Sequence, residues 1–194
     1  MRTSSSTVQK SDQSEVLFDT HPEVSLDFKH VQNALKDGYQ RPFLLVDSNI
    51  IRQKARRFKA AIPRVHPHYA VKANPDPRVL TALIEENVGF EIASIAELDL
   101  LMQLGVPAAE IFYSNPMKSR AYLEYAASKG VEWYVLDSVE ELRKIVSVKP
   151  DAKMYLRIDT PNIGSDWPLA GKFGTHLGDI HEIIHEAVEL KADL

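Results

Sequence analysis

The chain has 194 residues, a formal net charge of −4 and 44% hydrophobic residues. This is enough for a sizeable core and too balanced for a disordered chain. The near balance of 23 basic and 27 acidic residues, without a basic run, gives no reason to expect nucleic acid or an anionic membrane as a partner. No apolar stretch or signal core predicts a membrane segment, and the absence of cysteine fits a reducing compartment. We therefore expect a cytoplasmic globular protein.

Most of the chain reads as alternating strands and helices. Residues 1–20 are polar and Ser-rich, and we expect a disordered tail. From Arg41 onward, short β-branched and aromatic runs alternate with stretches of helical period. The predicted strands are 43–46, 68–71, 89–93, 111–113, 133–136 and 154–158. The predicted helices are 48–61, 76–87, 95–104, 119–129, 138–146 and 176–190.

Helix start and stop signals agree with these ranges. Asp76 and Ser138 are suited to the N-cap, and Ser138 with Glu141 forms a capping-box pattern. Gly105 and Gly130 stand where helix ends need a left-handed residue. Strict alternation predicts a parallel sheet, either a closed (β/α)8 barrel or an open doubly wound sheet. Because the phosphate-binding glycine motifs of open sheets are missing, the barrel is favoured.

Polar residues recur near the ends of five successive apolar strands, about one strand and helix apart: Lys72, Glu91, Asn115, Asp137 and Arg157. Each of them could simply extend into solvent or pair locally. In a barrel, however, the carboxyl ends of the strands converge on the active-site face. Several charges in phase therefore indicate a catalytic site.

Lys72 is the most informative residue of this series. Its apolar neighbours in Tyr-Ala-Val-Lys-Ala-Asn-Pro are expected to desolvate it and lower its pKa, which would make it an amine nucleophile able to form a Schiff base with a carbonyl cofactor. Glu91 and Arg157 are expected to form a charge-balanced pair beside it.

The run His-Tyr-Ala-Val-Lys-Ala-Asn-Pro at 68–75 resembles the lysine motif of the fold-type III pyridoxal-phosphate decarboxylases, the family of ornithine, lysine, arginine and diaminopimelate decarboxylases. The Pro-Leu-x-x-Lys-Phe-Gly block is more similar to the ornithine and lysine branch, although Glu91 stands where many ornithine decarboxylases have Asp. Further ordered matches lie at 89–94, 96–98, 113–118, 156–158, 167–169 and 172–174.

The resemblance implies an incomplete (β/α)8 TIM-type barrel of about five barrel strands plus a lead-in strand. Residues 21–62 would be a lead-in segment whose strand belongs to a missing β-domain, and 63–194 the N-terminal part of the cofactor-binding barrel. The family's phosphate loop and ring-stacking histidine would lie beyond Leu194. We therefore expect a fragment, with a homodimer as the complete form.

By the same resemblance, Lys72 would form the internal aldimine with pyridoxal 5'-phosphate, and Ala70, Glu91 and Arg157 would lie close to the cofactor. The expected reaction is decarboxylation of a basic amino acid, ornithine or lysine favoured, to an amine of polyamine biosynthesis such as putrescine or cadaverine. The partner would be this small-molecule substrate.

Three alternatives remain open. A truncated homologue could act by protein association, as regulatory relatives of ornithine decarboxylase do. An alanine-racemase-like pyridoxal-phosphate protein would share the strand-end lysine. A zinc hydrolase is suggested by His181-Glu182-x-x-His185, but the extended pattern fails at Val188 and Lys191, so no metal site is assigned.

Overall fold

The computed structural model describes residues 28–38, 42, 44–160, 164 and 171–194, and the chain divides into two compact units, residues 1–50 and 51–194. In the first unit, helix α1 (Phe28–Lys36) was not predicted from the sequence. The predicted lead-in strand is not formed over residues 44–47, which are irregular. Leu44 and Val46 are exposed there, and a strand is stable only beside a hydrogen-bonded neighbour. The expected tail, 1–20, lies outside the described residues.

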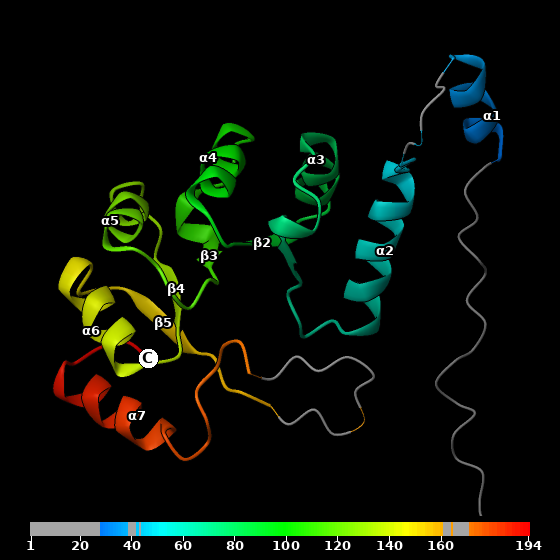
Figure 1. Cartoon of the computed structure of the whole chain (residues 1–194). Helices are drawn as coiled ribbons and strands as arrows, with labels where there is room; N and C mark the ends of the chain where they lie inside the picture. The colour runs from blue at the N-terminus through cyan, green and yellow to red at the C-terminus, as the bar shows by residue number, and fades with distance from the viewer. Residues whose placement is uncertain (1–27, 39–41, 43, 161–163, 165–170) are drawn as a thin grey trace, which may run out of the picture. The chain divides into compact units, whose positions relative to one another are not determined.

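The second unit is a parallel five-stranded sheet in the order β1-β2-β3-β4-β5 (Figure 1). The strands are β1 (His68–Ala70), β2 (Gly89–Ile92), β3 (Ile111–Tyr113), β4 (Trp133–Leu136) and β5 (Lys153–Leu156). Consecutive strands are neighbours and each is followed by a helix, as in a (β/α)8 barrel. The expected fold class is therefore confirmed, with the barrel incomplete in this chain.

Helices connect the strands, and each predicted helix of this unit is present. They are α2 (Ser48–Ala61), α3 (Pro77–Glu85), α4 (Ile95–Gln103), α5 (Arg120–Ser128), α6 (Val139–Val148) and α7 (Ile180–Glu189), with 3-10 turns η1 (Val71–Ala73) and η2 (Ala108–Glu110). Figure 1 shows α3 to α6 following one another along one side of the sheet. Across the described ranges, no helix combines the length and the apolar character needed to cross a membrane.

The predicted N-cap and C-cap residues are found at the helix ends, but the predicted capping box is not closed. The Asp76 side chain accepts a hydrogen bond from the Arg78 backbone N–H, and Ser138 accepts one from that of Glu141. Gly105 and Gly130 have φ of 87° and 92°. The Glu141 carboxylate does not close the predicted capping box, because it is paired with two lysines instead.

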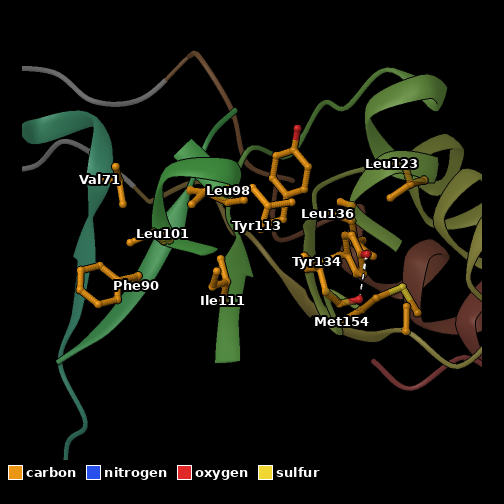
Figure 2. Packing of buried hydrophobic residues seen from close by; sticks show 14 of the residues in the cluster. Val71, Phe90, Leu98, Leu101, Ile111, Tyr113, Leu123, Tyr134, Leu136 and Met154 are labelled. Atoms are coloured by element: carbon orange, nitrogen blue, oxygen red, sulfur yellow. Dashed lines mark hydrogen bonds between the residues drawn. The ribbon is translucent and has the colours of Figure 1, made fainter. Parts of the chain in front are cut away.

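The two faces of the sheet differ because side chains alternate along each strand. We call one the helix-covered face; Figure 2 shows several of its side chains packed against α4 and α5 residues such as Leu98 and Leu123. Its strand residues are at most 5% exposed: Phe90, Ile92, Ile111, Tyr113, Tyr134, Leu136 and Met154. The opposite face, here the cavity face, carries His68, Ala70, Glu91, Phe112, Trp133, Val135 and Tyr155.

Candidate active site

A cavity of about 530 Å³ lies where the five strands end. All four predicted site residues line it: Ala70, Lys72, Glu91 and Arg157. Strand ends meet at this edge because the strands are parallel and in sequence order. Its other lining residues are Ile92, Ala93, Ser114, Asn115, Pro116, Val135, Tyr155, Leu156, Lys172 and Phe173.

Lys72 reaches this cavity from turn η1, directly after β1 ends at Ala70. The preceding Val71 is fully buried, whereas Lys72 is exposed. The expectation that apolar neighbours desolvate Lys72 is therefore wrong for this structure. The physical reason is that the apolar Val71 is packed into the core, whereas Lys72, in the turn that follows the strand, lines the open cavity.

Glu91 is held by a hydroxyl group. The Ser114 Oγ donates a 2.9 Å hydrogen bond to Glu91 Oε2, and the Tyr155 hydroxyl lies 2.7 Å from the same Ser114 Oγ. Burial is the main cause that raises the pKa of the Tyr155 phenol. Sequence reasoning missed Ser114 and Tyr155, because an isolated hydroxyl in a strand gives no signal of its partner.

Arg157 is placed differently from the expectation. Its guanidinium lies 5.4 Å from the centre of the Phe173 ring, a cation–π geometry. Between Glu91 and Arg157, both in the described part of the chain, the structure has no ion pair. The predicted pair is wrong for this structure: the Glu91 carboxylate accepts a hydrogen bond from Ser114, and the Arg157 guanidinium lies over the Phe173 ring instead. Glu91 and Arg157 line one cavity without an ion pair between them.

Lys118 is a buried charge that the sequence analysis did not single out. Its side chain is fully buried and its Nζ lies 2.9 Å from Glu141 Oε1. The same ammonium donates to the carbonyls of Asn115 and Val135, at 2.9 and 2.7 Å. Burial lowers the pKa of Lys118, and the Glu141 carboxylate opposes that shift. Because Asn115 and Val135 line the cavity, this lysine fixes part of its wall.

Asp137, another residue of the charged series, does not line the cavity. Its Oδ2 accepts a 2.9 Å hydrogen bond from the Gly174 backbone N–H. Gly174 has φ of 107°, and a Cβ atom there would lie 2.7 Å from the Asp159 nitrogen, so only glycine fits. Asp137 thereby holds the segment that supplies Lys172 and Phe173 to the cavity.

The zinc-hydrolase alternative gains no support. His181, Glu182 and His185 are all exposed on α7. In the part of the chain that the structure describes, no cluster of three or more His, Cys, Asp or Glu residues could hold a metal ion. A zinc site needs a third protein ligand.

The parallel sheet, with a lysine, a carboxylate and an arginine lining the cavity at its strand ends, defines an α/β protein with the strand order of a (β/α) barrel. A protein-family profile described as "Pyridoxal-dependent decarboxylase, pyridoxal binding domain" matches residues 48–192. The chain belongs to this family of fold-type III decarboxylases, as its motifs predicted.

Individual relatives agree. Ornithine decarboxylase of Schizosaccharomyces pombe is 39% identical over 152 residues, 78% of this chain and 35% of the relative. Antizyme inhibitor 2 of Homo sapiens is 38% identical over 145 residues, 75% of this chain and 32% of the relative. The chain thus spans about a third of the length of these curated relatives.

Solved structures of similar proteins share the fold. The arginine decarboxylase of Paramecium bursaria Chlorella virus, bound to agmatine, has a TM-score of 0.80 and 33% identity, covering 84% of this chain and 45% of that one. The lysine/ornithine decarboxylase of Vibrio vulnificus, complexed with cadaverine, has a TM-score of 0.75 and 30% identity, covering 88% and 44%. The sheet described here therefore corresponds to part of a decarboxylase barrel.

Proposed function

We propose that this chain is the cofactor-binding part of a pyridoxal-phosphate-dependent decarboxylase that acts on a basic amino acid, with Lys72 as the residue to which the cofactor attaches. The observation that carries the proposal is the position of Lys72, whose side chain is exposed at the strand-end cavity that Glu91 and Arg157 also line. Ala70, Glu91 and Arg157 complete the proposed cofactor-binding set.

The residues present fit such a cofactor. Lys72 supplies the primary amine that an aldehyde cofactor requires. Lys72, Arg157 and Lys172 outweigh Glu91 in charge around the cavity, so an anionic phosphate compound is favoured there. Pyridoxal phosphate, when bound, supplies the electron sink for the pair left by the departing α-carboxylate. The protein's own part is to hold the cofactor and to fix the carboxylate and guanidinium around it.

The substrate follows from the relatives. Solved structures similar to this chain were obtained with agmatine, cadaverine or putrescine, the amines formed from arginine, lysine and ornithine. They support a basic amino acid as the substrate, and the Pro-Leu-x-x-Lys-Phe-Gly block together with the ornithine decarboxylases among the relatives favours ornithine or lysine for the complete protein. We further propose that the complete protein is a cytoplasmic homodimer.

A second candidate is regulatory association without catalysis. It is favoured by the similarity to antizyme inhibitor 2 of both Xenopus laevis and Homo sapiens, at 37% and 38% identity. The two candidates differ in one measurable respect, because only the first requires cofactor attached to Lys72 and release of carbon dioxide.

The test is to incubate the 194-residue chain with pyridoxal phosphate, reduce it with borohydride and map the modified peptide by mass spectrometry. We expect selective labelling of Lys72, its loss in Lys72→Ala, and normal labelling in Lys54→Ala, which removes an exposed lysine on α2. Because Lys72 is exposed, Lys72→Ala should leave the unfolding midpoint unchanged. Labelling scattered over several lysines would contradict the proposed role of Lys72.

The complete protein then decides between the two candidates. Release of carbon dioxide from ornithine or lysine, abolished by Lys72→Ala, would establish the decarboxylase. A protein that does not release carbon dioxide from ornithine, lysine or arginine would instead favour the regulatory candidate.

A further inference from the structure

We propose that Tyr155 and Ser114 are positioning residues, which hold and orient the Glu91 carboxylate at the cavity through a directed chain of hydrogen bonds. The hydrogen-bonded series Tyr155–Ser114–Glu91 itself follows from the contacts in the structure. Its consequence for the cofactor rests on the proposed function, in which Glu91 belongs to the cofactor-binding set.

Glu91 on β2, Ser114 directly after β3 and Tyr155 on β5 meet on the cavity face. Glu91 lies on β2 opposite Phe112 of β3, and Ser114 follows Phe112 by two residues, so Ser114 projects on the same side. The Ser114 backbone N–H donates to the carbonyl of Ile92 at 2.9 Å, which continues the β2–β3 ladder and fixes the position of the serine. The Ser114 hydroxyl therefore reaches Glu91 while the serine backbone stays hydrogen-bonded to β2.

Tyr155 reaches the same serine from β5. It pairs in register with Val135 on β4, and its hydroxyl extends past that strand to Ser114. Val135 has an aliphatic side chain without a hydrogen-bonding group, so it does not compete for the phenol. The Tyr155 ring also lies 5.8 Å from that of Phe112. Both ends of the tyrosine side chain are thus held.

The direction of the two hydrogen bonds is fixed by chemistry. An ionised carboxylate can only accept, so the single hydroxyl proton of Ser114 is donated to Glu91 Oε2. Ser114 then has no proton to offer Tyr155, and the phenol must donate to Ser114. The sequence of donors is therefore Tyr155, Ser114, Glu91. The two bonds strengthen each other, because a serine hydroxyl that donates to a carboxylate becomes a better acceptor for the phenol.

The phenol remains a donor at neutral pH. Burial raises the pKa of Tyr155, and the negative charge of Glu91 raises it further. Glu91 Oε2 therefore accepts a hydrogen bond from a serine hydroxyl whose orientation is itself fixed by Tyr155. A ligand in the cavity meets a carboxylate that is restrained in rotation and already ordered before binding.

Titration of Tyr155 in the cofactor-free protein tests the hydrogen-bonded series directly. The Tyr155 signal of the 194-residue protein is followed by NMR with ¹³Cζ-labelled tyrosine and assigned with Tyr155→Phe. We expect Glu91→Gln to lower the pKa of Tyr155, because it removes a negative charge, and Ser114→Ala to lower it as well, because it removes the acceptor to which the neutral phenol donates. A Tyr155 titration that neither substitution moves would overturn the proposal.

The effect on ligand binding tests positioning. We expect Tyr155→Phe and Ser114→Ala each to weaken pyridoxal phosphate binding about fivefold, the value of one hydrogen bond. The double variant should bind no more weakly than Ser114→Ala, because Tyr155 acts through the serine. The matched control is Tyr125→Phe, which removes a phenol bonded to the Asp99 carboxylate between α5 and α4 and should leave binding unchanged.

The outcomes separate this inference from the proposed function. Fully additive losses in the double variant, or unchanged affinity in both single variants, would overturn the positioning role while leaving cofactor binding established. A wild-type chain that does not bind pyridoxal phosphate would overturn the proposed function, and the Tyr155 titration would still decide the hydrogen-bonded chain.

Discussion

The two faces of the sheet differ in burial and in polarity. On the helix-covered face the strand residues are apolar or aromatic and nearly inaccessible, and helix residues such as Leu80 and Leu142 are fully buried against them. On the cavity face, His68, Glu91 and Tyr155 keep part of their surface open and find partners across strands. The first face contributes stability through burial. The second keeps polar groups available for a ligand.

This difference teaches how substitutions should be interpreted. Changes on the helix-covered face should alter the free energy of unfolding, whereas changes on the cavity face should alter binding more than stability. Lys118 stands between the two, because its charge is buried among core residues while its hydrogen bonds fix carbonyls of the cavity wall.

The largest loss of stability is expected from Phe90→Ala. Phe90 is 2% exposed on the helix-covered face, and removing a buried aromatic ring costs about 3–5 kcal/mol. The measurement is urea unfolding followed by circular dichroism. Phe58→Ala is the matched control, since Phe58 is 42% exposed on α2 and should change stability by no more than about 0.5 kcal/mol. Equal effects at the two positions would contradict the assignment of the core.

A slightly smaller loss is expected from Lys118→Met, which removes one partner of a buried ion pair. The cost should be about 3 kcal/mol, at the low end for such changes, because Lys144 still neutralises Glu141. The same unfolding experiment measures it, with the exposed Lys54→Met as the control. A neutral result at Lys118 would show that the pair gives no net stabilisation and that packing alone holds the cavity wall.

A modest effect is expected from Phe112→Leu on the cavity face. The Phe112 ring stacks on Trp133, with centroids 4.8 Å apart and planes 13° apart. Losing such a stacked pair costs about 1 kcal/mol. A loss as large as that of Phe90→Ala would mean that the cavity face is also a core, and the comparison of the two faces would fail.

The smallest effect is a pH dependence at His68. Burial lowers the pKa of His68, and the neighbouring His66 adds to that shift. The unfolded chain therefore binds the proton more readily than the folded chain, so the contribution of His68 to stability is present above about pH 6.5 and fades as the pH falls through the lower folded value. The check is urea unfolding at pH 5 and 7, in which His68→Gln should flatten this dependence.

Several features could be predicted from local sequence alone. The five strands and the helices between them follow from alternating apolar periodicity, and the N-caps Asp76 and Ser138 follow from side chains that can accept a backbone hydrogen bond. The convergence of Lys72, Glu91 and Arg157 on one cavity follows from their equal phase along parallel strands. The lead-in strand predicted over 43–46 is not formed at residues 44–47, because a strand depends on a hydrogen-bonded neighbour.

The sequence by itself therefore determined the order of strands and helices from residue 48 onward, the family and the set of residues at the strand ends, because these depend on local spacing and on motifs. Only the tertiary structure decided which of these residues touch. It left Lys72 exposed instead of desolvated, separated Glu91 from Arg157, joined Glu91 to Ser114 and Tyr155, and buried Lys118. Such contacts depend on strand register and side-chain reach between segments far apart in the chain, which a linear pattern does not encode.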